Sequence, residues 1–181
     1  EVFYEDYRPP SFLEAEGAKD VGIEMHSLSK TYNMTGWRIG MAVGNSELIR
    51  ALNKLKSNVD SRQFPAIDIA AAHALEHVDN AETLALYRKR RDILVEGLNK
   101  LGWEVKKPLA SLYVWAKIPS GYTSAEFVKT LLQDAGVLAI PGNGYGQYGE
   151  GYIRMSLTVS GDKDGERVHE AVQRIAKHIK F

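Results

Sequence analysis

The spacing of hydrophobic positions predicts strands and helices that follow one another along the whole chain. Residues 21–26 and 39–43 are short apolar runs with the length of strands, and Gly44-Asn45 closes the second run. Residues 27–38 between them are polar and rich in hydroxyl groups. We therefore expect two strands joined by a polar connection.

Three helices are predicted in the middle of the chain. Ser46 can cap the first, and Pro65 fits the first turn of the second, which reaches about Val78. Asn80 can cap a third, long helix that Gly102 ends. One stripe of this helix contains Leu84, Tyr87, Arg91, Leu94, Leu98 and Leu101. The long helix is the natural boundary between two units, residues 1–78 and 79–181.

The second unit also mixes strands and helices. Residues 112–118 alternate between apolar and other side chains, as a strand with one buried face does. Thr123 and Glu126 have the spacing of a capping box and open a helix that Gly136 ends. There follow a short buried strand at 137–140, a glycine-rich loop, a strand at 152–159 and a final amphipathic helix. The fold class is thus α/β or α+β, and we assign α/β.

Composition argues against several classes of protein. The 181 residues include 23 basic and 23 acidic side chains, and this balance argues against nucleic acid or an anionic membrane as the main partner. The absence of cysteine excludes disulfides and fits a cytoplasmic protein. No apolar run approaches the roughly 18–20 residues that span a bilayer. The chain opens without Met in a strand-like run, which suggests a fragment or a processed chain.

A lysine follows the first predicted strand in a setting that suggests chemistry. Lys30 has Ser27 and Ser29 beside it, and Arg38 follows eight residues later. We expect the lysine to be buried, which disfavours the charged ammonium and favours the nucleophilic neutral amine. Arginine matches phosphate oxygens two at a time, and the serines add hydroxyl donors. The set suits an aldehyde cofactor that carries a phosphate, although a lysine after a strand is more often a solvated loop residue.

Residues 27–40, Ser-Leu-Ser-Lys-Thr-Tyr-Asn-Met-Thr-Gly-Trp-Arg-Ile-Gly, resemble the lysine signature of class I/II aminotransferases. These are enzymes of fold type I that use pyridoxal 5'-phosphate (PLP). The family pattern is Ser-x-x-Lys, then Arg eight residues later and Gly two further, and every position matches. The resemblance implies that Lys30 holds PLP covalently and moves a proton between substrate and cofactor. It also implies that Arg38 and Ser27, with Ser29, bind the phosphate.

The resemblance runs through the whole chain and is strongest to the branch that includes LL-diaminopimelate aminotransferases, with alanine- and aspartate-type relatives close behind. It implies transfer of an amino group from an amino acid to a 2-oxo acid. Residues 1–78 would be a remnant of the large PLP-binding domain, and residues 79–181 a linking helix and a small α+β domain. Family members are usually dimeric, so we expect a homodimeric parent enzyme. The family's contacts to the cofactor ring lie upstream of Glu1, so we expect the chain alone to be nearly inactive.

A second functional residue is expected in the strand at 152–159. Arg154 lies on its polar face, opposite Ile153, Met155 and Leu157. A solvent-facing arginine on a strand is the common case. The resemblance implies instead that Arg154, which follows Pro141-Gly142 and a glycine-rich loop, grips the substrate α-carboxylate. We expect the loop to provide flexible backbone over the mouth of the active site.

We assign no function to three other features of the sequence. Gly144-x-Gly146-x-x-Gly149 matches a dinucleotide fingerprint by letter, but a strand and not a helix is predicted to follow it. The basic run at 88–91 is interpreted as a solvated helix face. His73 and His77 have the spacing of metal ligands on a helix, but no third ligand is evident, so no metal is predicted.

Two alternatives to transamination remain open. Other PLP enzymes of fold type I, such as C–S lyases, decarboxylases and synthases, are not separated from aminotransferases by these residues. A transcription regulator can also keep an aminotransferase-like domain without catalysis. Such regulators carry a DNA-binding domain at the N-terminus, so the sequence upstream of Glu1 would identify one.

Overall fold

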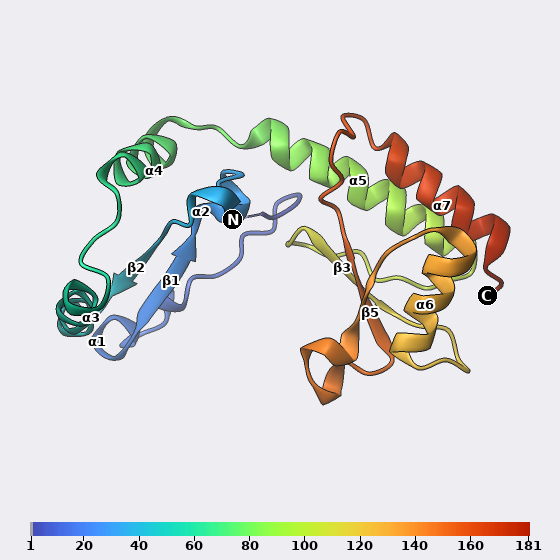
Figure 1. Cartoon of the computed structure of the whole chain (residues 1–181), viewed down its shortest axis with the longest axis horizontal. Helices are drawn as coiled ribbons and strands as arrows, with labels where there is room; N and C mark the ends of the chain where they lie inside the picture. Colours follow the sequence, from blue (N-terminus) through green and yellow to red (C-terminus); the bar gives the residue numbers. More distant parts are fainter. Residues whose placement is uncertain (1) are drawn as a thin grey trace. The chain divides into compact units, whose positions relative to one another are not determined.

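The chain divides into two compact units. The structure is a computed structural model that describes residues 2–181. The N-terminal unit contains Arg8–Asn80 together with Val2, and the C-terminal unit contains Phe3–Tyr7 and Ala81–Phe181 (Figure 1). The division after Asn80 falls close to the predicted boundary. The place of Phe3–Tyr7 differs from the prediction, because this stretch packs with the C-terminal unit although it precedes the N-terminal one.

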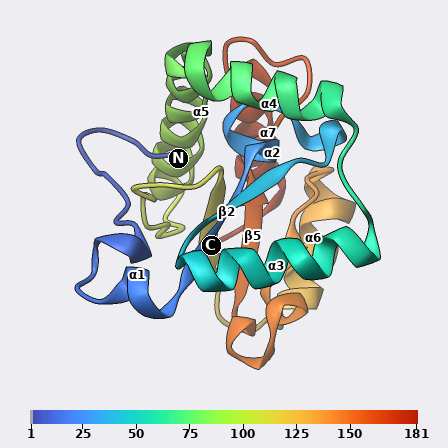
Figure 2. The ribbon, with the colours of Figure 1, turned by 90° about the vertical axis from the view of Figure 1, so that its left-hand side faces the viewer.

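The N-terminal unit is built on a two-stranded antiparallel sheet. β1 (Ile23–Ser27) pairs with β2 (Gly40–Gly44), so that Ser27 lies opposite Gly40. The other elements are η1 (Phe12–Glu14), α1 (Ala18–Val21), α2 (Leu28–Thr31), η2 (Thr35–Trp37), α3 (Ser46–Val59) and α4 (Pro65–His77). α3 and α4 lie at opposite ends of the β1–β2 hairpin (Figure 2). The two predicted strands are confirmed, as is the helix that starts at Pro65.

The core of the N-terminal unit lies beneath the polar connection between the strands. Leu28 and Met34 from the connection pack with Ala71 and Ala74 of α4, and these side chains are between 2% and 7% exposed. Ile39 packs against the same cluster. Small alanine side chains allow the connection to approach α4 closely. The packing thereby fixes the segment that carries the predicted cofactor residues.

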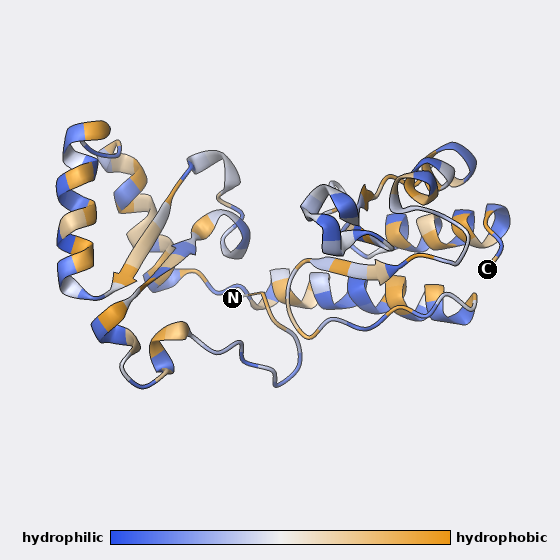
Figure 3. Cartoon of the chain, turned by 90° about the horizontal axis from the view of Figure 1, so that it is seen from below, coloured by the Kyte–Doolittle hydropathy of each residue, from blue (hydrophilic) through white to orange (hydrophobic). Residues whose placement is uncertain are grey.

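α3 begins at a different cap from the predicted one. Asn45 Oδ1 accepts the backbone N–H groups of Glu47 and Leu48, each at 3.0 Å. Asn45 and not Ser46 is therefore the N-cap, because its side chain satisfies two free donors at the helix start. Leu48 and Leu55 are 43% and 63% exposed. Apolar and polar bands alternate along α3, the helix at the far left of Figure 3.

The C-terminal unit packs its helices against one face of a three-stranded antiparallel sheet. The strand order is β3 (Tyr113–Lys117), β5 (Tyr152–Ser156) and β4 (Ile140–Pro141). The other elements are α5 (Ala81–Lys100), α6 (Ser124–Ala135), η3 (Gly142–Tyr145), η4 (Gln147–Gly149) and α7 (Glu166–His178). α7 contacts both α5 and α6. The capping box formed by Thr123 and Glu126 is confirmed, and Gly136 ends α6 in the left-handed conformation.

The predicted alternation along β3 and β5 is confirmed. Val114 and Ala116 of β3 are buried, and so are Ile153 and Met155 of β5. A sheet covered by helices on one face produces this period of two. The other face of the sheet therefore carries Arg154 together with aromatic side chains.

The strand predicted as buried at 137–140 is wrong in length and in burial. Only Ile140 and Pro141 form β4, and β4 lies at the edge of the sheet. Leu138 is 75% exposed and Ile140 is 42% exposed, whereas Ala139 is buried. An edge strand has a neighbour on one side only, so its apolar side chains are covered incompletely.

The basic run at 88–91 is not simply a solvated face, because two of its arginines are buried. Arg90 is 5% exposed. Its guanidinium donates to the backbone carbonyl oxygens of Leu157 and Val159, each at 2.9 Å, and to that of Asp162. Carbonyl oxygens that follow β5 thus accept the terminal N–H groups of a buried cation that the helical pattern alone assigns to solvent, and the buried Asp162 carboxylate lies 3.6 Å from its Nε.

Arg91 fixes the N-terminal stretch Phe3–Tyr7 to the C-terminal unit. Its side chain is fully buried and pairs with Glu5, while its guanidinium carbon lies 4.3 Å from the ring centroid of Tyr4. It also donates to the carbonyl oxygen of Pro108 at 3.1 Å and pairs with Asp92 at 2.8 Å. The hydrogen bond from Arg91 lowers the pKa of Glu5. The Arg91 guanidinium therefore contacts four groups at once: the Glu5 and Asp92 carboxylates, the Tyr4 ring and the Pro108 carbonyl oxygen.

Tyr4 should make the C-terminal unit sensitive to alkaline pH. The side chain is 1% exposed and its hydroxyl donates to the Ser111 carbonyl oxygen at 2.9 Å. Burial raises the pKa of Tyr4 from 10.0 to about 12. The raised value means that its contribution is complete below pH 10 and is lost as the pH rises towards 12. Urea unfolding at several pH values should show that the free energy of unfolding falls between pH 10 and pH 12. Tyr4→Phe should remove the part of this pH dependence that comes from Tyr4. An identical slope in Tyr4→Phe would assign the loss to other groups.

Two further observations concern predicted absences. Among residues 2–181, no helix combines the length and apolarity needed to cross a membrane. The ring centroids of His73 and His77 lie 4.6 Å apart, and the described part of the chain contains no group of three His, Cys, Asp or Glu side chains that could hold a metal ion.

Candidate functional site

The predicted cofactor residues lie on the connection between β1 and β2, residues 27–40, which we call the excursion. β1 ends at Ser27 and β2 begins at its partner Gly40, so the chain leaves and re-enters the sheet at one point. Between these residues it forms α2 and η2. The excursion therefore brings Ser27, Ser29, Lys30 and Arg38 into one small segment of the N-terminal unit.

Lys30 is exposed, so the expectation of a buried lysine is wrong for this chain. The short helix α2 directs Leu28 and Ser29 into the core, where they are 2% and 9% exposed. Lys30 follows on the outward side. Its amine is therefore accessible to a ligand.

The two serines have different roles in the local structure. Ser27 is the N-cap of α2, and its hydroxyl oxygen accepts the backbone N–H of Ser29 at 3.2 Å. This bond orients the Ser27 side chain at the start of the excursion. The Ser29 carbonyl oxygen accepts the Thr35 hydroxyl at 2.9 Å. Both serines are thus held in place by the fold of residues 27–35.

Two residues that were not predicted position Arg38. The Arg38 guanidinium donates to the Thr35 carbonyl oxygen at 2.8 Å, and Thr35 is itself bonded to Ser29. Gln63 donates to the Arg38 carbonyl oxygen at 2.9 Å. The many hydroxyl groups among residues 27–38 could have identified Thr35 as a residue of the site. Gln63 lies 25 positions from Arg38 in the sequence and had no local signal.

Arg38 has an unusual backbone conformation, with φ 52° and ψ 50°. This left-handed region is uncommon for residues other than glycine, and such outliers concentrate at functional sites. The Arg38 side chain is exposed, and within residues 2–181 no carboxylate forms an ion pair with it. The fold therefore holds a guanidinium at a fixed place and leaves most of its N–H groups available.

These residues fit a cofactor that has an aldehyde and a phosphate. Lys30 offers an accessible primary amine, and Arg38 offers a planar donor without an acidic partner in the described chain. Ser27 adds an exposed hydroxyl group at the start of the same excursion, and the buried Ser29 follows two positions later. Guanidinium and hydroxyl donors together are a common set for phosphate oxygens. The donor set is consistent with PLP and needs no metal.

Arg154 lies in the C-terminal unit, on the face of the sheet that the helices do not cover. Its guanidinium carbon is 4.1 Å from the ring centroid of Tyr113 and 4.6 Å from that of Tyr145. Trp115 is its neighbour across the β3–β5 ladder. Among residues 2–181, no acidic side chain pairs with Arg154 and its side-chain N–H groups donate no hydrogen bond. The guanidinium is thus available to an anionic ligand.

The glycine-rich loop before β5 depends on two glycines in direct backbone contact. A Cβ atom on Gly142 would lie 2.1 Å from the Gly149 carbonyl oxygen, and one on Gly149 would lie 1.9 Å from the Gly142 carbonyl oxygen. Both positions require glycine because the two halves of the loop touch there. Close packing at these two glycines was not predicted, and the flexibility expected of the loop stays a prediction. Strand β5 and no helix follows the loop, so it is not a dinucleotide site.

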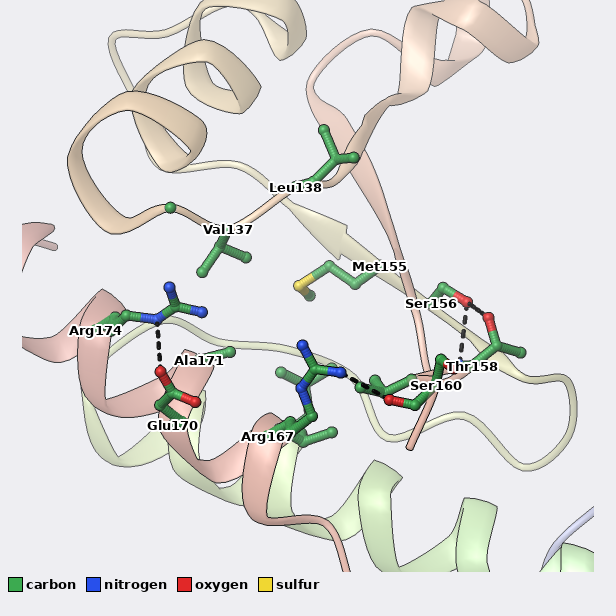
Figure 4. A pocket seen from close by; sticks show the side chains of 14 residues that line it. Val137, Leu138, Met155, Ser156, Thr158, Ser160, Arg167, Glu170, Ala171 and Arg174 are labelled. Atoms are coloured by element: carbon green, nitrogen blue, oxygen red, sulfur yellow. Dashed lines mark hydrogen bonds and ion pairs between the residues drawn. The ribbon is translucent and has the colours of Figure 1, made fainter. Parts of the chain in front are cut away.

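A cavity of about 570 Å³ lies elsewhere in the C-terminal unit. It is lined by parts of α7, the end of β5 and the loop before β4, and none of the predicted site residues lines it (Figure 4). Arg174 pairs with Glu170 at 3.7 Å, and Arg167 donates to the Ser160 carbonyl oxygen at 2.7 Å. The cavity is therefore separate from the chemistry that the sequence predicts.

Curated relatives of high similarity are aminotransferases. The sequence is 52% identical over 179 residues to the LL-diaminopimelate aminotransferase of Moorella thermoacetica, covering 98% of this chain and 45% of that protein. It is 56% identical over 180 residues to the LL-diaminopimelate aminotransferase of Nitratidesulfovibrio vulgaris strain Miyazaki F, covering 97% of this chain and 45% of that protein. The chain thus spans less than half the length of these relatives.

Solved structures and a family profile agree with this similarity. The apo-BacF structure from Bacillus subtilis matches with a TM-score of 0.88 and 39% identity over 97% of this chain and 45% of that chain. An aminotransferase from Staphylococcus aureus matches with a TM-score of 0.89 and 37% identity over 97% of this chain and 46% of that chain. The profile of the family "Aminotransferase class I and II" matches residues 3–175. The chain therefore belongs to the class I and II aminotransferase family.

Proposed function

We propose that the protein carrying this chain transfers an amino group from an amino acid to a 2-oxo acid with PLP as its cofactor. The observation that carries the proposal is the excursion between β1 and β2, which presents Lys30, Ser27 and Arg38 together. Membership of the aminotransferase family supports it. Conversion of a 2-oxo acid to its amino acid by the full-length enzyme, dependent on added PLP, is the direct test. Purified enzyme with full PLP loading and no amino transfer to any 2-oxo acid would contradict it.

Each proposed site residue has a separate task. Bound PLP supplies an electron-withdrawing ring that stabilises negative charge at the substrate Cα. The Lys30 amine would hold the cofactor and would carry a proton to and from the substrate Cα. Arg38 holds the phosphate, with Ser27 and Ser29 as hydroxyl donors. Arg154 binds the substrate carboxylate and thereby orients the Cα–H bond.

LL-diaminopimelate is the amino compound that the sequence similarity favours. Both relatives described above carry its name, at 52% and 56% identity. Matched structures of other names lie further away, such as an aromatic aminotransferase from Pyrococcus horikoshii at 30% identity. A panel of amino donors tested with the full-length enzyme should show the highest kcat/KM for LL-diaminopimelate. A higher value for an aromatic amino acid or for aspartate would reassign the substrate and leave transamination intact.

Arg154→Ala should impair substrate binding without removing the cofactor. Loss of a charge-assisted pair with a carboxylate is worth about 1.5–3 kcal/mol, so the KM for the amino donor should rise about 10- to 150-fold. PLP absorbance should be unchanged. The matched control is Arg167→Ala, an exposed arginine of the same unit on α7, which should leave KM unaltered. Loss of PLP from Arg154→Ala would move this residue from the substrate to the cofactor.

The alternative reactions, the regulator without catalysis and the homodimeric state of the parent enzyme can each be tested. Product analysis with the full-length enzyme separates transamination from decarboxylation, C–S cleavage and synthase chemistry. A regulator without catalysis would bind PLP but release no new amino acid. The homodimeric state of the parent enzyme is checked by its mass in solution.

A further inference from the structure

Arg154 differs from the other arginines of the fold in what holds it. Arg90 and Arg91 are held by carbonyl and carboxylate oxygens, which use their N–H groups. Those two arginines also lie over a tyrosine ring, but Arg154 contacts rings alone among residues 2–181, with its guanidinium carbon 4.1 Å from the Tyr113 centroid and 4.6 Å from that of Tyr145. Both distances lie well within the roughly 6 Å range of cation–π attraction. A ring attracts the cation through its face and leaves the N–H groups free.

The two rings reach Arg154 from different parts of the unit. Tyr113 is two positions from Trp115, the partner of Arg154 in the β3–β5 ladder, and is thus its diagonal neighbour on the same face. Tyr145 comes from η3, at the tip of the loop that the contact between Gly142 and Gly149 closes. The Tyr145 ring also lies 5.8 Å from that of Trp115 in an edge contact. The strand and the loop therefore converge on one guanidinium.

Burial alone does not explain the place of Tyr145. Tyr145 is 50% exposed, so half of its surface stays in water in this position. Tyr148 in the same loop is 90% exposed and makes no ring contact within residues 2–181. The loop thus directs one of its two tyrosines towards Arg154 and leaves the other in solvent.

We infer that Tyr113 and Tyr145 are positioning residues that hold the Arg154 guanidinium ready for a carboxylate. This inference rests on the proposed role of Arg154 in binding substrate. A free arginine side chain loses rotamer freedom when it binds, and this loss opposes binding. The two rings impose part of that loss before the ligand arrives. The carboxylate then meets a guanidinium with restricted orientation and free N–H donors.

The Arg154 side-chain signals in NMR spectra of the 181-residue chain test the inference. Arg154→Lys identifies these signals by their loss. In the unaltered chain they should be shifted upfield, because the protons lie over aromatic rings. Tyr145→Leu and Tyr113→Leu should each reduce this shift, whereas Tyr145→Phe and Tyr113→Phe, which keep the ring, should preserve it. Tyr148→Leu is the matched control and should change nothing.

Sodium acetate is the probe for binding, compared with sodium chloride at equal ionic strength. The dissociation constant for acetate, read from the Arg154 signals, should rise about three- to tenfold in the leucine variants and stay constant in the phenylalanine variants. An unshifted Arg154 signal, or leucine variants that bind acetate as tightly as the unaltered chain, would overturn the positioning role. A shifted signal that does not respond to acetate would instead overturn the carboxylate role of Arg154. Thermal unfolding of each variant identifies any that fail to fold. If a leucine variant does not fold, the two phenylalanine variants provide the test, because the positioning role requires them to keep both the upfield shift and the acetate affinity.

Discussion

Lys30→Ala should abolish covalent attachment of PLP in the full-length enzyme. Borohydride reduction of the unaltered enzyme should fix PLP to the peptide that contains Lys30, and mass spectrometry of the variant should find no such adduct. The rate of amino transfer should fall by at least about 100- to 10,000-fold, because the variant also loses the group that moves the Cα proton. PLP should still bind reversibly, since Arg38, Ser27 and Ser29 remain.

The control for this result is Lys54→Ala. Lys54 is an exposed lysine on α3 of the same unit and has no assigned role. Its removal should leave both the adduct and the rate unchanged. If Lys30→Ala kept a borohydride-fixed cofactor, another lysine would be the attachment site, and the interpretation of residues 27–40 would be wrong.

Arg91→Ala should destabilise the C-terminal unit by about 2–4 kcal/mol. Hydrogen bonds to charged groups contribute about 1.5–3 kcal/mol, and the Arg91 guanidinium makes several at once. Its loss would also leave the Pro108 carbonyl oxygen and the Tyr4 ring without their partner. Urea unfolding followed by circular dichroism should show the lower midpoint. Hydrogen exchange should show residues 3–7 opening more readily than in the unaltered chain.

Arg88→Ala is the matched control for Arg91→Ala. Arg88 lies one turn away on the same helix and pairs with the same Glu5 at 3.8 Å, but its side chain is 50% exposed. An exposed pair of this kind contributes about 0–1 kcal/mol. Equal effects of the two substitutions would mean that burial of Arg91 adds nothing to its contribution.

Local patterns made much of the fold predictable from sequence. The capping box at Thr123 and Glu126 was found because both partners lie within one turn of helix. The buried faces of β3 and β5 were found because a covered sheet imposes a period of two. The proposed cofactor residues lie within one short stretch of sequence, so their grouping between β1 and β2 could be predicted, while their role stays a prediction.

The missed features depend on partners that are distant in sequence. Arg90 is buried because carbonyl oxygens 67 to 72 positions away accept its N–H groups. Arg38 is fixed partly by Gln63, which no local pattern connects to it. Lys30 was expected to be buried, but the turn of α2 places its neighbours inward and Lys30 outward. This orientation of α2 also involves distant residues, because Leu28 packs with Ala71 and Ala74 of α4.

Because Phe3–Tyr7 belongs to the C-terminal unit, a single cut between Asn80 and Ala81 would not separate the two units completely. A truncated chain that starts at Ala81 would keep every helix and strand of that unit but lose Tyr4, which is 1% exposed, and Glu5, which pairs with Arg91. Such a chain would have an unfilled space where Tyr4 packs, and the buried Arg91 would keep Asp92 as a partner but lose Glu5. The folding unit is discontinuous along the gene. An independent version of it would have to join residues 3–7 to the chain from 81 onward, as a circular permutation or a co-expressed peptide does.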